Sequence, residues 1–341
     1  MHRHLMIPIT DTSQIGEARR AATRLAEDLQ FNATDAGRVS IIATELATNL
    51  VRHATTGGSI LMLAQESAGE KHLEITAIDS GPGMADVQRC LQDGFSTAGT
   101  PGNGLGAVRR LADQMDLLSS PTGTAIWCRI AAQAPAQKHT ERSFAFGAVC
   151  VPAPMEILCG DAWRIERAPG RASILVADGL GHGPSAFEAA EAVAGIFDKN
   201  PFDSPRSLIE AAHSAISGTR GAAVAIANID LQAGKLIYAG VGNISGSLLT
   251  AGASRGLFSH NGIVGHQVRK VQEFEYPFDA QSMLIMHSDG LQTRWSLEKY
   301  PGLARRHPAV IAGVLYRDFK RGKDDATVIV AAPAAAGEAV P

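Results

Sequence analysis

The chain has 341 residues, of which 45% are hydrophobic and 19% charged, the composition of a soluble globular protein long enough for two domains. The formal net charge is -3, which excludes the basic excess of a nucleic-acid-binding protein. There is no apolar run of the roughly 18–20 residues that cross a bilayer, and the first residues lack the apolar core of a signal peptide. We therefore expect a cytoplasmic protein that binds neither nucleic acid nor membrane.

The first third of the chain predicts a mixed α/β domain over residues 1–133. Helical spacing covers residues 14–29, and Thr34 or Asp35 could cap a second helix that runs to about residue 53. Strands are expected at 59–64, 73–78 and 124–130, and a glycine-rich stretch leads into a helix from about 105 to 113. A small, polar, proline-marked segment, residues 134–140, follows and is interpreted as a linker.

The remainder predicts a second domain over residues 141–332. Strands are expected at 144–150, 173–177, 222–229, 236–239, 283–287 and 326–330, and helices at 185–197, 205–216 and 308–319. Residues 333–341 are expected to form a disordered tail. The four cysteines form no C-x-x-C pair, which indicates free thiols in a reducing cytoplasm.

Three polar side chains of the first domain have a spacing that suits a magnesium nucleotide. Glu45 and Asn49 are four residues apart on a predicted helix, so they share one face. An amide oxygen can ligate Mg²⁺, and a nearby carboxylate can accept the proton of an attacking hydroxyl group. Asp79 ends a predicted strand, where its carboxylate can accept a hydrogen bond from an adenine amino group.

Two groups of glycines accompany these side chains. Gly81 and Gly83 allow a base to approach the backbone closely, and the stretch Gly102-Asn-Gly-Leu-Gly106 opens a helix whose free N–H groups favour phosphate. Each motif alone is weak, because such patterns occur on solvated helices and in ordinary turns. Their order and spacing together indicate a nucleotide site.

The three motifs resemble the N, G1 and G2 boxes of the GHKL (Bergerat-fold) ATP-binding superfamily. The stretch from Ile42 to Ala54 is similar to the small serine-kinase branch, which contains anti-sigma factors and stressosome switch kinases. The resemblance implies that ATP and Mg²⁺ bind here, with Asn49 as a Mg²⁺ ligand, Asp79 as the reader of adenine and Glu45 as the candidate base. The remaining residues that it implies in nucleotide binding are Gly81, Gly83, Gly102, Gly104, Leu105 and Gly106.

Four separated aspartates mark the second domain: Asp161 after a glycine, Asp178 and Asp289 before one, and Asp324 before Asp325. Two of them end predicted strands and one precedes the last strand, so their carboxylates can meet at the end of a sheet. Carboxylates there can bridge two hard divalent ions, which lower the pKa of a shared water and clamp phosphoryl oxygens. A single Asp-Gly after a strand is ordinary turn chemistry, but four in this arrangement indicate a hydrolytic metal site.

This arrangement resembles the metal-dependent protein phosphatase (PPM) class, in its bacterial sporulation and stress branch. The resemblance implies a β-sandwich flanked by helices with a binuclear Mn²⁺ or Mg²⁺ centre. Asp178 would bridge the metals as the catalytic carboxylate and Gly179 would offer its carbonyl oxygen. The other metal ligands would be Asp161, Asp289 and Asp324, with Asp325 as the alternative to Asp324.

Three further residues of the second domain have open roles. His182 suits either a catalytic acid or a structural contact, and the structural role is favoured. Arg164 and Arg167 follow Asp161 and are candidates for gripping the substrate phosphate, although a solvent-facing strand explains them equally well.

The expected fold class is therefore α/β and α+β, with an N-terminal Bergerat α/β sandwich followed by a PPM-type β-sandwich flanked by helices. The leading hypothesis is a bifunctional bacterial partner-switching regulator that phosphorylates and dephosphorylates serine or threonine on STAS-domain antagonists or stressosome scaffold proteins. A second hypothesis makes the first domain an ATP-liganded binding module, for a sigma factor or another partner, without kinase activity. A third makes the protein a phosphatase gated by nucleotide.

Overall fold

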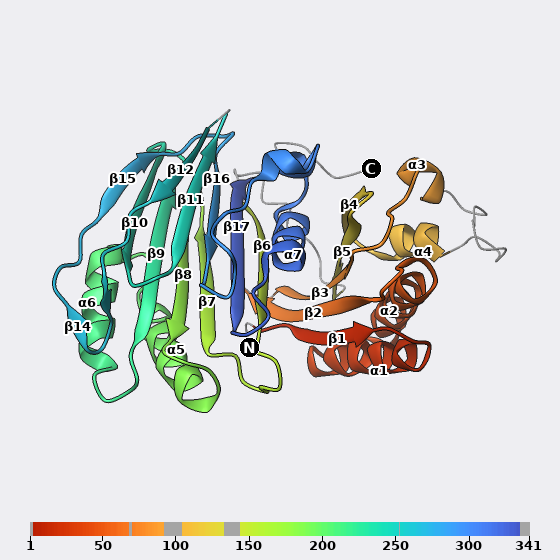
Figure 1. The fold of residues 1–341 in the computed structure, drawn as a ribbon, viewed down its shortest axis with the longest axis horizontal. Coiled ribbons are helices and arrows are strands. Elements are labelled where there is room, and N and C mark those ends of the chain that lie inside the picture. Colours follow the sequence, from red (N-terminus) through yellow and green to blue (C-terminus); the bar gives the residue numbers. More distant parts are fainter. Residues whose placement is uncertain (1–2, 68–69, 92–103, 133–143, 252, 335–341) are drawn as a thin grey trace.

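The computed structural model describes residues 3–67, 70–91, 104–132, 144–251 and 253–334. The predicted linker, Gly102 and residues 335–341 of the predicted tail lie outside the described residues. Across the described chain the elements stack as layers in the order helices, sheet, sheet, helix, sheet, helices (Figure 1). No helix of this described part has the length and apolarity needed to cross a membrane.

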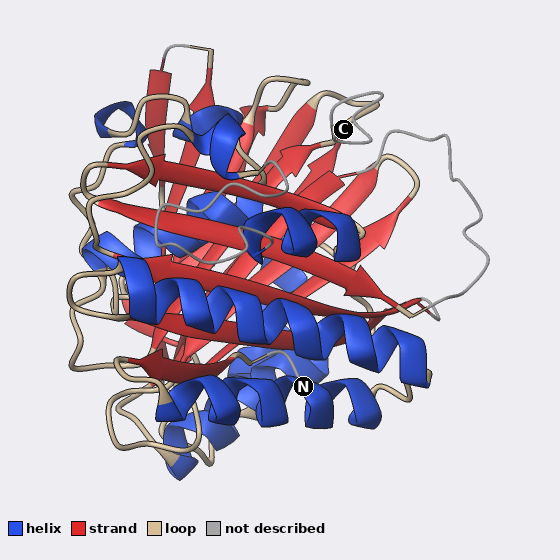
Figure 2. Ribbon diagram, turned by 90° about the vertical axis from the view of Figure 1, so that its right-hand side faces the viewer, coloured by secondary structure: helices blue, strands red, loops and turns tan. Residues whose placement is uncertain are grey.

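A five-stranded antiparallel sheet, in the order β1-β2-β3-β5-β4, forms the N-terminal part. Its strands are β1 (Leu5–Ile9), β2 (Gly58–Ser67), β3 (Glu70–Asp79), β4 (Gln114–Ser120) and β5 (Gly123–Ala131). The helices are α1 (Ser13–Asp28), α2 (Ala33–His53), the short α3 (Val87–Cys90) and α4 (Gly104–Leu111). The two long helices lie side by side across the sheet (Figure 2). Ala18, Ala22 and Ala26 of α1 recur every four residues and are all buried, so small side chains line the contact with α2.

The N-terminus of α2 differs from the sequence-based expectation. The cap is Asn32, whose side chain accepts a hydrogen bond from Asp35 N at 2.8 Å. Thr34 and Asp35 were expected to cap this helix, and that prediction is wrong. Asp35 lies in the first turn and is buried, because its carboxylate pairs with Arg38 at 3.0 Å and accepts from the Asn32 amide. An acidic side chain in a first turn is stabilised by the helix dipole, so it gives the same local signal as a cap.

Two five-stranded antiparallel sheets form the C-terminal part as a sandwich, in the orders β15-β10-β9-β8-β7 and β12-β11-β16-β17-β6. The first sheet comprises β7 (Asp161–Ala168), β8 (Arg171–Gly179), β9 (Ala222–Asp230), β10 (Lys235–Val241) and β15 (Phe274–Pro277). The second comprises β6 (Phe144–Val151), β11 (Ser245–Thr250), β12 (Ala253–Leu257), β16 (Met283–His287) and β17 (Ala326–Pro333). Between them lies an apolar core that includes Trp163, Tyr238 and Phe278. Pro333 pairs with Phe144, so the last strand extends into the predicted tail by one residue.

Helices cover the outer face of the first of these sheets. They are α5 (Pro184–Phe197) and α6 (Pro205–Ala215), and both begin at a proline, which is favoured at the first helical position. The remaining short elements are β13 (Gly262–Ile263), β14 (Gln267–Val268) and the 3₁₀ turns η1 (Leu297–Lys299) and η2 (Leu303–Arg305).

Helix α7 (Pro308–Phe319) lies between the C-terminal sandwich and the N-terminal sheet (Figure 1). Ten of its twelve residues are buried, as expected for a helix that is apolar nearly all round. One core joins both parts here, with Trp127 of β5, Ile311 of α7 and Val328 of β17 among its members. The Trp127 indole stacks on the His307 imidazole with centroids 3.8 Å apart. The two parts are therefore joined by a continuous apolar interface.

Candidate functional sites

Helix α2 carries Glu45 and Asn49 to the start of α4. Both side chains are half-buried. A Cβ on Gly104 would lie 2.9 Å from Glu45 Oε2 and 3.7 Å from Asn49 Oδ1. Glycine at this position keeps the space between the two side chains and the N-terminus of α4 open. Free backbone N–H groups at such an N-terminus attract phosphate.

Asp79 lies at the end of β3 with its carboxyl group fixed by the backbone. Gly81 N donates a hydrogen bond to Asp79 Oδ1 at 2.7 Å. Burial raises the pKa of the Asp79 carboxyl, while hydrogen bonds from the backbone of Gly81 and Thr124 act in the opposite direction. A carboxylate with a fixed orientation suits a directional contact with a base.

The glycines next to Asp79 have a steric reason to be glycine. Gly83 has φ +72°, and a Cβ there would lie 2.1 Å from Ser120 O. The following residue, Met84, donates its N–H to Ser119 Oγ at 2.7 Å, which ties this segment to the β4–β5 hairpin. Leu105 and Gly106 are buried in α4, and the Leu105 side chain packs in the apolar core.

The aspartates predicted as metal ligands come from both sheets of the sandwich. Asp161 and Asp178 are directly opposite each other in the β7–β8 ladder. Ser288 Oγ donates to Asp161 Oδ2 at 2.7 Å and accepts from Thr327 N at 3.0 Å. This serine therefore joins β7 of one sheet to β17 of the other. Asp289, the next residue, is thereby brought to the same end of the sandwich.

Burial and mutual repulsion dominate the electrostatics of this cluster. They raise the pKa of Asp178 to about 9, first through burial and then through the charges of four other aspartates, namely Asp161, Asp289, Asp324 and Asp325. Burial, with the charges of Asp325 and Asp289, raises the pKa of Asp161 to about 7. The structure therefore brings the four predicted aspartates close enough to one another for their charges to interact.

The donor set fits divalent cations. The buried atoms Asp161 Oδ1 and Asp325 Oδ2 have no well-aligned hydrogen-bond donor among the described residues. Unpaired oxygens on repelling carboxylates are stabilised by a cation. Within the described part of the chain, no three His, Cys, Asp or Glu side chains converge closely enough to hold one ion. Water and backbone carbonyls, such as that of Gly179, would complete the coordination.

Asp325 differs from Asp324 in its surroundings. Asp325 is 3% exposed, and its Oδ1 accepts from Ala153 N at 2.8 Å. Asp324 is half-buried, and its Oδ1 accepts from Asp325 N at 3.0 Å. Asp325 thus anchors the segment after β6, and Asp324 keeps the more open carboxylate. We retain Asp324 as the proposed ligand.

Further residues at the metal site were not found by motif reasoning. Asn243 Nδ2 donates to Asp289 Oδ2 at 2.8 Å. Glu156 Oε1 lies 2.7 Å from His182 Nδ1, across a sequence separation of 26 residues. Ser288 directly precedes Asp289, so its position beside a predicted ligand was the one signal available in the sequence. Asn243 and Glu156 carried no such signal.

The arginines suggested by the sequence have other partners. Arg164 donates to Glu191 at 2.8 Å and to Asp198 at 3.2 Å, and the Arg167 guanidinium lies 4.7 Å from the Phe146 ring centroid. Neither is free to hold a phosphate without losing these contacts. Arg220, unlike these two arginines, lies beside the loop between Asp178 and α5. Its Nη1 is 3.0 Å from where a Cβ would stand on Gly181 in that loop.

Helix α7 contacts one candidate site and leads into the other. Arg317 Nη1 donates to Asp79 O at 3.1 Å. Two residues after the helix ends, Arg321 N donates to Gly290 O at 2.8 Å, directly after Asp289. The chain then reaches Asp324. One helix therefore contacts the proposed adenine-reading segment and leads into two of the metal-site loops.

Comparisons with known proteins match the two parts of the chain to different families. Residues 9–130 match the histidine kinase-like ATPase domain, and residues 168–333 match stage II sporulation protein E (SpoIIE). The serine/threonine-protein kinase RsbT of Bacillus subtilis (strain 168) is 38% identical over 102 residues, which are 30% of this chain and 76% of that protein.

Two solved structures resemble the chain. One is described under the words "The bacterial stressosome: a modular system that has been adapted to control secondary messenger signaling". It is 28% identical with a TM-score of 0.52, and the match covers 55% of this chain and 99% of that chain. The other, RsbX in complex with magnesium, is 22% identical with a TM-score of 0.51, covering 59% of this chain and 99% of that chain. The second likeness is one of fold.

The fold thus joins a histidine kinase-like ATPase domain to a domain that matches SpoIIE. The chain belongs to the histidine kinase-like ATPase family of the kinase RsbT, and its second part is of the SpoIIE type. The predicted resemblances to the GHKL and PPM classes, and the predicted fold class, are confirmed.

Proposed function

We propose that this protein phosphorylates serine or threonine on a STAS-domain antagonist or a stressosome scaffold protein with its N-terminal domain, and removes the phosphate with its C-terminal domain. The observation that carries the proposal is the pair of sites on one chain. Glu45 and Asn49 face the start of α4 beside Gly104, and Asp178 lies in a cluster of carboxylates with raised pKa values. We take residues 1–133 and 141–332 as the two domains, with 134–140 as the linker, and place the protein in the cytoplasm, where ATP is available.

In the kinase domain, Asn49 would hold Mg²⁺ and Glu45 would accept the proton of the attacking hydroxyl group. Asp79 would accept the adenine amino hydrogen bond, with its orientation set by Gly81 N at 2.7 Å. The N-terminus of α4 would stabilise the phosphates through its backbone N–H groups.

In the phosphatase domain, two Mn²⁺ or Mg²⁺ ions would supply Lewis-acid activation of water and phosphoryl oxygens. Asp178, Asp161, Asp289, Asp324 and the Gly179 carbonyl would hold them. Ser288 would hold Asp161 by donating to Oδ2 at 2.7 Å, which leaves Oδ1 for a cation. Asn243 would fix Asp289 in the same way through Oδ2 at 2.8 Å.

The test is a paired assay with a purified STAS-domain partner. Radiolabelled ATP and Mg²⁺ should label the partner, and Mn²⁺ without ATP should release the label. If no transfer occurs under any metal condition, the N-terminal domain acts as a binding module instead, for a sigma factor or another partner. Where transfer does occur, Glu45→Ala should abolish it while ATP binding remains, and where it does not, a binding module should keep its partner affinity in the same variant.

A second candidate function is a phosphatase gated by nucleotide. The observation that favours it is the Arg317–Asp79 hydrogen bond at 3.1 Å, since it joins the proposed nucleotide site to the helix that leads into the metal loops. Nucleotide bound at Asp79 would change the free energy of that contact, and α7 would transmit the change. Phosphatase rates measured with and without ATP test this function.

A further inference from the structure

The segment between β6 and β7 presents unusual apolar exposure next to the metal-site aspartates. Met155 is fully exposed and Ile157 is 84% exposed. Met155 also has φ +72°, a backbone conformation that residues other than glycine rarely adopt. Exposed apolar side chains on a strained backbone are held there by surrounding contacts, and such positions cluster at functional sites.

Contacts with Asp325, next to Asp324, and with His182, in the loop after Gly179, hold this segment in place. At its start, Ala153 N donates to the buried Asp325 Oδ1 at 2.8 Å. In its middle, Glu156 Oε1 lies 2.7 Å from His182 Nδ1, three residues after Gly179. Glu156 N also donates to Ala153 O at 3.0 Å, which closes the turn. The tip with Met155 and Ile157 is thus fixed relative to the reaction centre.

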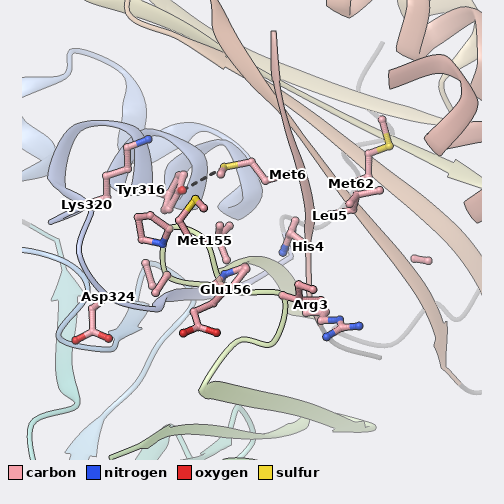
Figure 3. Close-up of a pocket in the computed structure, with 18 of the residues that line it drawn as sticks. Arg3, His4, Leu5, Met6, Met62, Met155, Glu156, Tyr316, Lys320 and Asp324 are labelled. Atoms are coloured by element: carbon pink, nitrogen blue, oxygen red, sulfur yellow. Dashed lines mark hydrogen bonds between the residues drawn. The ribbon is translucent and has the colours of Figure 1, made fainter. Parts of the chain in front are cut away.

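The same tip lines a cavity that extends from Asp324, one of the proposed metal ligands, to the N-terminal sheet. The cavity has a volume of about 640 Å³ and includes Asp324, Glu156 and Met155 on one side and Leu5 and Met62 on the other (Figure 3). Among the described residues, five large apolar side chains are exposed, and three of them, Leu5, Met155 and Ile157, line this cavity. Their concentration here indicates a surface that is covered when a partner binds.

We propose that Leu5, Met155 and Ile157 form a docking surface for the phosphoprotein substrate, and that they select substrates with apolar side chains flanking the phosphorylated serine or threonine. This inference rests on the proposed phosphatase function. The occupant follows from the lining of the cavity, because Asp324, a proposed metal ligand, lies on its wall, so a phosphoprotein bound at the metal site would reach the three apolar side chains. Burial of three apolar side chains would favour such substrates over free phosphate esters.

The experiment uses the full chain and two phosphoserine peptides, one with leucines flanking the phosphoserine and one with serines. Wild-type protein with Mn²⁺ should hydrolyse the leucine peptide with at least about a tenfold higher kcat/KM. The double variant Met155→Gln/Ile157→Gln should lose this preference and keep its rate on p-nitrophenyl phosphate. Ile41→Gln, an exposed isoleucine on α2, is the matched control and should keep the preference.

Each of the other possible outcomes contradicts a different part of the proposal. If the double variant keeps the preference, the docking surface is wrong and the phosphatase function stands. If its rates on both peptides and p-nitrophenyl phosphate fall equally, the segment only supports the metal site. If the double variant turns a dimer into a monomer with peptide kinetics unchanged, the occupant is a second copy. If wild-type protein hydrolyses nothing, the phosphatase function fails, and peptide binding by fluorescence anisotropy, which needs no turnover, decides the docking surface by the same leucine preference.

Discussion

Arg317 of α7 donates a hydrogen bond from Nη1 to the backbone oxygen of Asp79, 3.1 Å away and 238 residues earlier in the chain. The same guanidinium makes two 2.7 Å hydrogen bonds to the Asp318 carboxylate, which hold it in place. A Cβ on Gly123 would lie 2.6 Å from Arg317 Nη1, so glycine there makes room for the arginine. The end of the strand that presents Asp79 is thus in direct contact with the C-terminal domain.

Replacing this arginine should uncouple the two sites. In wild-type protein we expect ATP to change the Mn²⁺-dependent phosphatase rate, and in Arg317→Met we expect the ratio of rates with and without ATP to approach one, since the contact with Asp79 is lost. Rates on p-nitrophenyl phosphate at saturating ATP measure it. Arg306→Met is the control, because Arg306 pairs with Asp116 at 3.2 Å across the same interface without touching Asp79. If ATP has no effect on wild-type protein, gating is excluded.

Glu45→Gln should lower phosphotransfer to a STAS-domain partner by about 10²–10⁴-fold, the range for loss of a general base. ATP affinity should change little, because the amide keeps the size of the side chain beside Gly104. Transfer is measured with radiolabelled ATP and affinity with a fluorescent ATP analogue. The control is Glu17→Gln, on α1. Unchanged transfer in Glu45→Gln would remove Glu45 from the reaction.

Asp178→Asn should abolish metal-dependent hydrolysis of p-nitrophenyl phosphate, with a loss of more than about 100-fold. Mn²⁺ should raise the Tm of wild-type protein by mass action and should raise that of the variant much less. The comparison is made by thermal unfolding with and without Mn²⁺, and Asp28→Asn, an exposed aspartate at the end of α1, should behave as wild type. Persistent activity in Asp178→Asn would exclude the proposed metal centre.

Metal affinity should rise with pH. Burial and neighbouring charges raise the pKa of Asp178 to about 9 and that of Asp161 to about 7, so both carboxyls must lose protons when a cation binds at neutral pH. Mn²⁺ affinity should therefore increase from pH 6 to pH 9. The number of protons released when Mn²⁺ binds should fall over the same range. Calorimetry in buffers of different ionisation enthalpy measures the release. A pH-independent affinity would show that these carboxyls do not bind the ion.

The domain interface should weaken in mild acid. Burial lowers the pKa of His307 to about 4, with Glu74, Asp116 and Arg129 nearby, and also lowers that of His4 to about 4. Because both folded-state values lie below 6.5, the unfolded chain binds more protons between pH 6.5 and 4, so stability is lost as pH falls through this window. Each histidine accounts for about 3 kcal/mol at full protonation.

His307→Phe tests this contribution. Phenylalanine can keep the stack on Trp127 but cannot take a proton, so the variant should lose less stability between pH 6.5 and 4 than wild type. The measured quantity is the difference between the free energies of unfolding of the two proteins in urea at each pH. The metal-site carboxyls contribute equally to both proteins, so their contribution cancels in this difference. Glu74, whose pKa the interface holds at about 2 against the effect of its burial, titrates below this window. Parallel pH curves for the two proteins would contradict the prediction.

The sequence by itself determined what depends on short-range geometry. The spacing of four residues placed Glu45 and Asn49 on one face of α2, and Asp178 and Asp289 after apolar strands predicted carboxylates at sheet ends. Helix periodicity and strand alternation repeat within a few residues, so such patterns are readable from the sequence.

The tertiary structure decided what depends on burial of surfaces from distant segments. It placed α7 between two sheets, brought Arg317 to Asp79, and set Ala153 N on Asp325 across a separation of 172 residues. No local pattern encodes these pairs, because they result from packing apolar faces of separate elements against one another. For the same reason α7, which the sequence predicts as an ordinary helix, came to lie between the two parts, with Arg317 on the segment of Asp79.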